Sequence, residues 1–400
     1  MEKSKVVQLP QAVQELMEKL HLHGFSVYAV GGCVRDSLLG KSAFDWDMTT
    51  SALPQETKAV FEDCKTVDIG ISHGTVGVLK EGAVYEITTF RTDGAYTDSR
   101  HPDSVAFTPS LSEDLKRRDF TVNAMAYSER EGIIDLFGGR EDLKKGVIRT
   151  VGNPYDRFTE DALRILRGLR FASTLGFTVE PETLSAMHEK ADTLSFVSPE
   201  RKKEEIGKML CGKGAGTIVA ENASVLAKAW KGISEDRTKS NAKLLESLPN
   251  ELALRLAAFF CGEDASNVLK LLLEYRFDKK TAALVGDILF AKSKMPCKTP
   301  PDFKRLLGEF GETACLGAVE LLLAENTHFA QEHKQLFTKM AKSNVCVRIS
   351  QLQIGGNDLL AHVQGREVGR VLEALLEAVI CEKTENDKKA LLAYAQKHLF

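Results

Sequence analysis

The sequence predicts an α+β protein, in which a mixed α/β head at residues 1–150 precedes helices that continue almost to the C-terminus. Three observations support this prediction. With 400 residues, the chain is too long for one compact core. Short runs rich in β-branched and aromatic residues, separated by glycine, are concentrated before Asn153-Pro154. After that point, apolar residues recur at spacings of three and four, as in amphipathic helices.

The composition is that of a soluble globular protein, with 43% hydrophobic and 27% charged residues. No apolar run is long enough to span a bilayer, and the N-terminus lacks the residue order of a secretory signal. We therefore expect a cytoplasmic protein. Its eight cysteines form no C-x-x-C pair, so we expect reduced thiols rather than a zinc site. The formal charge of −3 means that a nucleic-acid partner requires a local basic surface.

The head begins with a predicted amphipathic helix that ends near Gly24. Its apolar face consists of Val13, Leu16, Met17 and Leu20. Three runs then have the composition of strands, namely FSVYAVGG, TVGVLK and AVYEITTF. Gly31-Gly32 ends the first of these runs and leads into a short predicted helix, VRDSLLG.

The second part of the chain is predicted to be helical. The clearest periodic segments are EDALRILRGLRFAS, SPERKKEEIGKML, LLESLPNELALRLAAFF and SNVLKLLLEYRF. KSKMPCKTPPDF is predicted to separate two helical blocks, because its prolines and lysines break the pattern. A short extended piece, VCVRISQLQI, is expected before the last two helices.

Two carboxylates one residue apart, Asp45 and Asp47, follow the glycine turn. On a strand, residues i and i+2 point to the same face, so the acids are expected side by side with Trp46 turned into the fold. Like charges this close repel each other unless a cation lies between them, and hard oxygen ligands suit Mg²⁺. The same pattern also occurs at solvated strand edges and in glycosyltransferases that use nucleotide sugars. These alternatives stay open for the pair alone.

The glycine turn before the acids is predicted to bind phosphate. Backbone amides at Gly32 can approach a triphosphate closely, and Arg35 supplies a planar, bidentate cation beside it.

The acid pair and its surroundings resemble a known family. GGCVRD, with ten residues from Arg35 to the first acid of FDWDMTT, is similar to the nucleotidyltransferase superfamily of poly(A) polymerases and tRNA nucleotidyltransferases. Further segments resemble, in order, motifs of the bacterial CCA-adding enzymes: EITTFRTDGAYTDSRHPDSVAF, RRDFTVNAMA, DLFGGREDLKKGVIRTVG, EDALRILRGLRFAS and SPERKKEEIGKML. The resemblance covers about the first 210 residues motif by motif, and the tail more loosely.

This resemblance implies a polymerase-β-like nucleotidyltransferase head at 1–150, followed by a helical neck at 151–225, a body at 226–300 and a tail at 301–400 that contacts tRNA. It implies an enzyme that adds CCA to the tRNA 3′ end from CTP and ATP without a template, with Mg²⁺ held by Asp45 and Asp47. Arg118 matches a position that contacts nucleotide in the family. Arg167 and Arg170 are expected either to surround a bound triphosphate or to brace the site. Whether the chain is a monomer or a homodimer stays open.

The segment EDALR suggests how two bases are selected. Cytosine and adenine present an amine beside a bare ring nitrogen, whereas uracil and guanine present a carbonyl beside a ring N–H. Asp161 can accept from the amine and Arg164 can donate to the ring nitrogen, so that C and A are bound and U and G rejected. The plain alternative is a solvated helix with an ion pair from Glu160 to Arg164. With the resemblance, we expect base reading.

Several interpretations stay open. Glu86 is either a third carboxylate near the metal or an outward strand residue, and Asp119 either orients Arg118 or Arg35 or forms a structural ion pair. The helix after Ser198 is expected to be scaffold. Rival functions are a CC-adding enzyme, an A-adding enzyme, a poly(A) polymerase and a non-catalytic RNA-binding relative.

Overall fold

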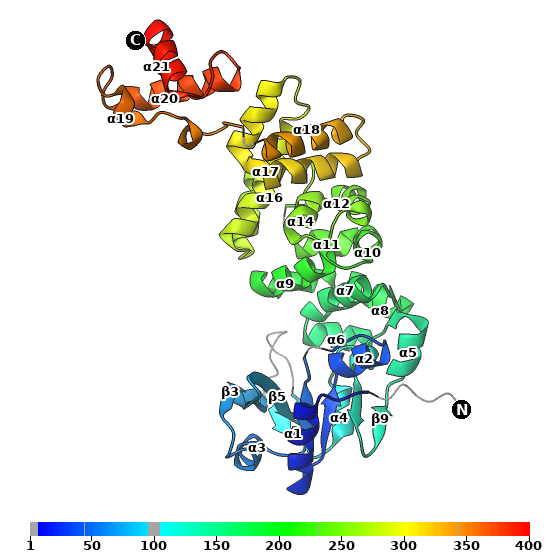
Figure 1. Cartoon of the computed structure of the whole chain (residues 1–400). Helices are drawn as coiled ribbons and strands as arrows, with labels where there is room; N and C mark the ends of the chain where they lie inside the picture. Colours follow the sequence, from blue (N-terminus) through cyan, green and yellow to red (C-terminus); the bar gives the residue numbers. More distant parts are fainter. Residues whose placement is uncertain (1–6, 44, 95–104, 231, 344) are drawn as a thin grey trace. The chain divides into compact units, whose positions relative to one another are not determined.

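The computed structural model describes residues 7–43, 45–94, 105–230, 232–343 and 345–400. Residue contacts divide the chain into two compact units, Met1–Lys239 and Ser240–Phe400. The first unit combines β-sheet and helices, and the second is helical in its described residues (Figure 1). The α+β fold predicted from the sequence is therefore confirmed. No helix among the described residues is both long and apolar enough to cross a membrane.

A mixed sheet of seven strands forms the centre of the first unit, in the order β3-β4-β5-β2-β1-β8-β9. The strands are β1 Val27–Val30, β2 Met48–Thr50, β3 Thr66–Gly70, β4 Thr75–Lys80, β5 Ala83–Thr89, β8 Met125–Ser128 and β9 Gly132–Asp135. Neighbouring strands are antiparallel except β2 and β5, which are parallel. Two small sheets pair β6 Arg91–Asp93 with β7 Val105–Phe107, and β10 Val147–Ile148 with β11 Thr178–Val179.

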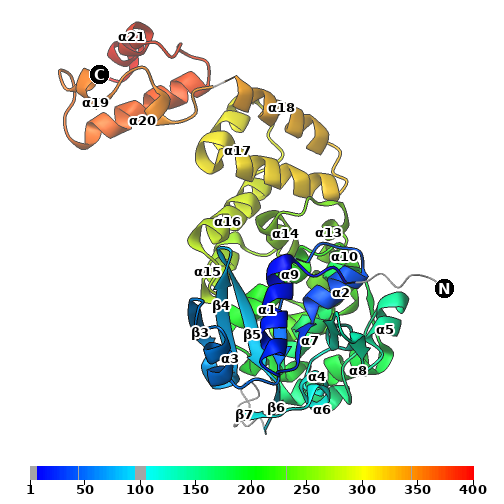
Figure 2. The ribbon, with the colours of Figure 1, turned by 60° about the horizontal axis from the view of Figure 1, so that its bottom comes forward.

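The two faces of the sheet differ in what covers them. Helices α1 Gln11–Leu22 and α3 Pro54–Val60 lie beside one face, which we call the core face (Figure 2). Its buried side chains include Met48, Val76, Val78 and Ile87. On the opposite face, which we call the open face, α4 Leu111–Lys116 packs its Leu115 against Tyr28 and Val30 of β1.

Helix α1 forms where the sequence predicts it. Pro10 precedes its first residue, and its predicted apolar face is buried. Gly24 follows with φ +86°, a left-handed conformation that favours glycine and ends the helix.

The helices that follow the sheet begin with α5 Gly139–Lys145 in the head. The others are α6 Pro154–Glu160, α7 Leu163–Leu175, α8 Pro181–Glu189, α9 Pro199–Leu210, α10 Ala215–Glu221, α11 Ala223–Ala229 and α12 Glu235–Ala242. The segment EDALRILRGLRFAS is not one helix, because α6 ends at Glu160 and Asp161 has the extended angles φ −143° and ψ 106°. Its carboxylate instead accepts the N–H of Leu163 at 3.0 Å and so starts a new helix.

Two hydrophobic clusters lie in the later part of the second unit, one between Cys297 and Phe337 and one between Leu352 and Ala395. The helices of this unit are α13 Leu244–Ser247, α14 Leu252–Phe259, α15 Ala265–Glu274, α16 Lys279–Ser293, α17 Pro300–Ala324, α18 Ala330–Lys342, α19 Gly356–Leu359, α20 Arg366–Ile380 and α21 Lys388–His398. The predicted break between helical blocks separates α16 from α17. Where an extended piece was expected, the described residues form the 3₁₀ turn η4 Ile349–Gln351 and no strand.

Candidate active site

The glycine turn lies between β1 and helix α2 Gly32–Leu38, as predicted. Gly31 has φ +81° and ψ −128°, which a residue with a side chain rarely adopts. A Cβ atom added at Gly31 would lie 3.4 Å from Nη1 of Arg118, and one added at Gly32 would lie 3.7 Å from Nη2 of Arg35. The turn therefore places two predicted nucleotide-binding arginines directly beside its backbone.

Both of these arginines are oriented by acidic or amide partners. Arg35 is only 9% exposed; its Nε and Nη2 each donate to Asp36 at 2.9 Å, and Nη1 donates to Asn123 at 2.6 Å. Arg118 follows α4 and donates through Nη2 to the buried Asp114 at 3.3 Å. Burial works to raise the pKa of Asp114, but Arg118 and Arg117 outweigh it and hold that pKa below its ordinary value.

Asp45 and Asp47 are exposed, and Trp46 between them is buried, so the predicted alternation is observed. Strand β2 begins later than expected, at Met48, so the acids lie just before it. The backbone N–H of Val30 nevertheless donates to the carbonyl of Asp47 at 3.0 Å, which continues the pairing with β1 by one residue. This hydrogen bond fixes the acid pair next to the glycine turn.

The acids influence each other electrostatically. Although Asp47 is exposed as a residue, neighbouring protein atoms partly desolvate its carboxyl and raise its pKa, with Arg118 opposing this shift and Asp45 adding to it. Glu86 of β5 also has a raised pKa, first through burial and then through repulsion by Asp47 and Asp45. The sequence left the role of Glu86 open, and in the structure its carboxyl is close enough to be repelled by both Asp47 and Asp45. Among the described residues, no group of three or more His, Cys, Asp or Glu side chains is arranged to hold a metal ion.

A divalent cation fits the pair on chemical grounds. The donors are two neighbouring carboxylates that are open to solvent, and their mutual repulsion is what a bound cation relieves.

The two residues expected to read the base each have partners in the structure. Asp161 accepts from Arg201 of α9 through both oxygens, at 3.3 and 2.7 Å. Arg164 is 9% exposed and pairs with Glu160, the alternative considered from the sequence; it also donates to the backbone carbonyls of Arg157 at 3.2 Å and Arg117 at 3.3 Å. Because α6 ends before Asp161, the two residues do not lie on the one continuous helix that the periodicity of EDALRILRGLRFAS predicted.

Arg167 and Arg170 have different main partners, although Nη1 of Arg167 also lies 3.7 Å from Oε1 of Glu205. Arg167 pairs with the buried Asp119, its Nη2 lying 2.7 Å from Oδ2, and Arg170 pairs with Glu205. Asp119 therefore pairs with Arg167, and not with Arg118 or Arg35, which agrees with the structural ion pair that the sequence left open. Burial works to raise the pKa of Asp119, but the Arg167 guanidinium outweighs it and holds that pKa low.

Phe171 connects the two groups of predicted residues. Its ring centroid lies 3.9 Å from the guanidinium carbon of Arg170, 5.3 Å from that of Arg35 and 5.5 Å from that of Arg167. The glycine turn and α7 therefore meet at one aromatic ring.

Sequence reasoning missed Arg201 and Glu205, which come from a helix expected to be scaffold. Their spacing of four residues places both on one face of α9 and was the available signal. Residues 95–104, within EITTFRTDGAYTDSRHPDSVAF, and Phe44 of FDWDMTT lie outside the described residues.

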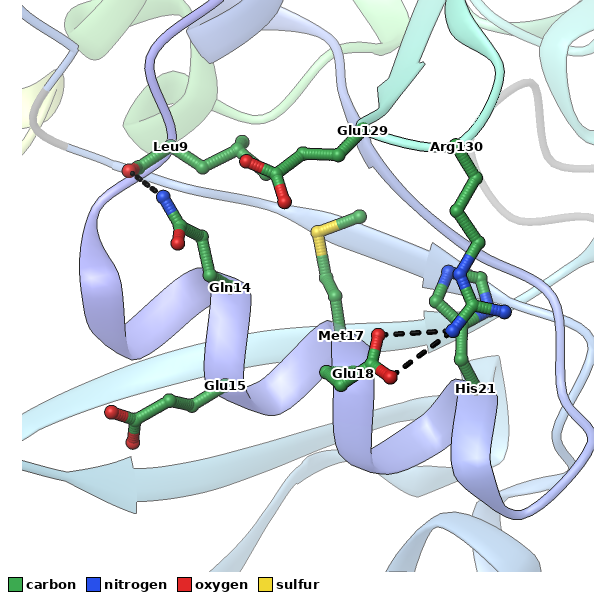
Figure 3. A pocket seen from close by; sticks show the side chains of 8 residues that line it. All are labelled: Leu9, Gln14, Glu15, Met17, Glu18, His21, Glu129 and Arg130. Carbon is green, nitrogen blue, oxygen red and sulfur yellow. Dashed lines mark hydrogen bonds and ion pairs between the residues drawn. The ribbon is translucent and has the colours of Figure 1, made fainter.

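A separate cavity of about 280 Å³ is formed by α1 and the turn after β8 (Figure 3). Its polar groups bind each other: Arg130 pairs with Glu18 at 3.0 Å, and the Gln14 side chain donates to the carbonyl of Leu9 at 2.9 Å. None of the predicted site residues lines it.

Three family models match the chain. They are the poly A polymerase head domain at residues 27–149, the "Probable RNA and SrmB- binding site of polymerase A" at 176–221, and tRNA nucleotidyltransferase domain 2 at 262–395.

Relatives match over nearly the whole length. The CCA-adding enzyme of Leuconostoc mesenteroides is 35% identical over 99% of each chain, and that of Geobacillus kaustophilus is 36% identical over 95% of each. The crystal structure of the Bacillus stearothermophilus CCA-adding enzyme in complex with CTP is 32% identical, covers 98% of both chains and has a TM-score of 0.82. The Thermotoga maritima CCA-adding enzyme complexed with tRNA_CCA has the same fold, with a TM-score of 0.68, 21% identity and coverage of 97% of this chain and 96% of that one.

Proposed function

The chain belongs to the family of CCA-adding tRNA nucleotidyltransferases, and we propose that it adds C, C and A to the 3′ end of tRNA from CTP and ATP, releasing pyrophosphate. The observation that carries the proposal is the exposed Asp45–Asp47 pair beside the Gly31 turn and Arg118, in a chain related to these enzymes over its full length. A tRNA substrate also accounts for a cytoplasmic site of action.

Asp45 and Asp47 are the proposed ligands of a divalent cation, for which Mg²⁺ is the natural choice. Carboxylate oxygens are hard ligands, and Mg²⁺ typically binds one or two carboxylates together with substrate phosphates. When bound, the ion supplies charge neutralisation for the phosphates and lowers the pKa of the attacking hydroxyl.

The triphosphate is proposed to lie against Gly32, Arg35 and Arg118. Arg118 is the better candidate for direct contact, because its Nε is buried without a hydrogen-bond partner among the described residues. Arg35 is already held by Asp36 and Asn123, so its role is a fixed positive charge beside the turn.

The proposed reaction is an in-line displacement at the α-phosphate. The terminal ribose hydroxyl forms the new P–O bond as the bond to the pyrophosphate oxygen breaks. Arg167 and Arg170 contribute positive charge near the phosphates. Asp119 holds the side chain of Arg167 in place, and Glu205 holds that of Arg170.

Base selection is proposed to use Asp161 and Arg164. Arg201 and the N–H of Leu163 leave acceptor positions on Asp161, because a carboxylate has about four lone-pair sites. In Arg164, described contacts account for three of about five guanidinium N–H groups. Each side chain therefore retains capacity for the base while its position is fixed by protein partners.

The test offers the purified protein tRNAs that end before CCA, after C and after CC, with each nucleotide separately. We expect two C and one A to be added, followed by a stop. Uncontrolled A tails indicate a poly(A) polymerase, and a halt after CC indicates a CC-adding enzyme. The matched control is Asp45→Ala, which is expected to bind tRNA without extending it.

The division into a head at 1–150, a neck at 151–225, a body at 226–300 and a tail at 301–400 is proposed from the same relationship. The tail is proposed to contact tRNA. It would recognise the shape and the sugar-phosphate backbone of the tRNA and not its base sequence.

A further inference from the structure

Part of the open face of the sheet is unusually apolar for a solvent-exposed surface. Val67 and Ile69 of β3 are 41% and 46% exposed, and Val84 of β5 is 47% exposed. Gly77 of β4 lies between them; a Cβ atom there would be 2.5 Å from Cδ1 of Ile69 and 2.9 Å from Cγ1 of Val84. The two aliphatic side chains therefore lie over bare backbone and form a continuous surface. We call Val67, Ile69, Gly77 and Val84 the apolar platform.

The platform lies in the same row of the sheet as the acids. Gly77 pairs with Val67 on one side and with Glu86 on the other. Met48 pairs with Ile87, so the same register continued back by one residue places Asp47 beside Glu86. Paired residues point to the same face, and strands are about 4.8 Å apart. The platform therefore begins roughly 10 Å from Asp47, on the same face, and extends to roughly 15 Å.

The nucleotide-binding residues lie on the opposite side of Asp47. The glycine turn continues from β1, and α4, which ends next to Arg118, covers β1 on the open face. In an in-line displacement, the attacking oxygen and the leaving pyrophosphate are on opposite sides of the α-phosphorus. If the pyrophosphate lies toward β1 and Arg118, the acceptor must approach from the side of β5, β4 and β3. That side is the platform.

We propose that the apolar platform binds the base of the 3′-terminal nucleotide of the RNA acceptor. The inference rests on the proposed function and adds a subsite to it. A distance of roughly 10 Å from the acids matches a ribose whose hydroxyl is at Asp47 and whose base extends along the row toward Gly77. The apolar faces of Ile69 and Val84 provide contact without hydrogen-bonding groups.

This chemistry suits an acceptor whose last base changes at every step. Successive acceptors end in the base before CCA, then C, then C. A subsite that read base edges would favour one of these ends, whereas apolar contact with the face of a base is tolerant of sequence. The incoming nucleotide is selected elsewhere, at Asp161 and Arg164.

The experiment compares wild type with the double variant Ile69→Ser/Val84→Ser in single additions of CMP to an acceptor-stem minihelix. We expect KM for the minihelix to rise about tenfold, equivalent to about 1.4 kcal/mol, while KM for CTP stays unchanged. Ile69→Met/Val84→Leu keeps the surface apolar and is expected to retain the wild-type KM. The matched control is Leu22→Ser, which removes a 75% exposed aliphatic side chain of α1 on the other side of the sheet.

A second measurement locates the base directly. Photocrosslinking of a minihelix with 4-thiouridine at its 3′ end is expected to label the tryptic peptides 66–80 or 81–91, which contain the platform. An unchanged acceptor KM in the double variant, or crosslinks confined to other peptides, overturns the inference. So does a changed oligomeric state with unchanged acceptor KM, since the surface then binds a second copy. If wild type extends no acceptor at all, the proposed function has failed instead.

Discussion

Replacing Arg201 by methionine is expected to weaken base selection more than catalysis. Arg201 holds both oxygens of Asp161, at 3.3 and 2.7 Å, and is the partner that sets the direction of this carboxylate. Methionine keeps much of the side-chain length but donates no hydrogen bond. Asp161 then retains only the N–H of Leu163 among these partners and can turn away from an incoming base.

The size of the effect follows from the contact. The Asp161 and Arg201 side chains are 15% and 24% exposed, so the pair is largely shielded from water. Hydrogen bonds to charged groups contribute about 1.5–3 kcal/mol. Taking about 2 kcal/mol for the lost orientation, the ratio of kcat/KM for CTP to kcat/KM for UTP is expected to fall about 30-fold. The ratio falls because CTP loses the carboxylate that accepts from its amine, whereas UTP loses the repulsion between that carboxylate and its own carbonyl.

The assay measures single additions of CMP and UMP to tRNA ending before CCA. Any general loss of folding or tRNA binding affects both nucleotides equally and cancels in the ratio. Arg201→Lys, which keeps the charge without the bidentate geometry, is expected to be intermediate. Lys228→Met, which removes an exposed partner of Asp192 in the same unit, is the control. Equal losses for CTP and UTP would refute the reasoning and leave Arg201 as scaffold.

Three further outcomes are expected. Asp45→Ala abolishes nucleotide addition while tRNA affinity, measured by filter binding, stays nearly unchanged; retained incorporation would contradict the metal assignment. Asp119→Asn lowers the free energy of unfolding by about 1.5–3 kcal/mol at neutral pH, because it removes the charge of a buried carboxylate that pairs with the half-buried Arg167. Since the pKa of Asp119 is held low, this stabilisation is complete above the ordinary aspartate pKa and is lost as pH falls through the folded value, so denaturation curves of variant and wild type should converge in acid. Gly139→Ala lowers stability by about 1–3 kcal/mol, because the added Cβ would overlap the backbone carbonyl of Thr121; an unchanged Tm would contradict this packing.

Much of the fold could be predicted because its signals are local. The apolar period of α1, its glycine stop and the Gly31 turn each depend on residues within a few positions of one another. The break between α6 and α7 could not be found in this way. The segment has a continuous helical period. The interruption depends on the Asp161 side chain, which accepts the N–H of Leu163 while Arg201, 40 residues away, holds the same carboxylate.

In the candidate site too, local features could be predicted from the sequence and long-range contacts could not. The acid pair and the arginines were identified from spacing and resemblance, because their residue types are dictated by the chemistry of phosphates and cations. Their partners were not, since Asp119 and Arg167 are 48 residues apart and Arg201 and Asp161 are 40 apart. Tertiary packing decides such pairings, and a charged residue on a helix has many possible partners along the chain.

These pairings explain how a chain with a net charge of −3 can present a site for a polyanion. Arg35, Arg164, Arg167 and Arg170 each contact a carboxylate within the first unit. Unpaired, such a group of guanidinium ions would repel one another and disperse toward solvent. Paired, they keep fixed positions while retaining N–H groups that point elsewhere, since a carboxylate satisfies only part of a guanidinium. At the proposed site, an incoming nucleotide would therefore meet cations that are already oriented, and its binding energy would not be spent on ordering them.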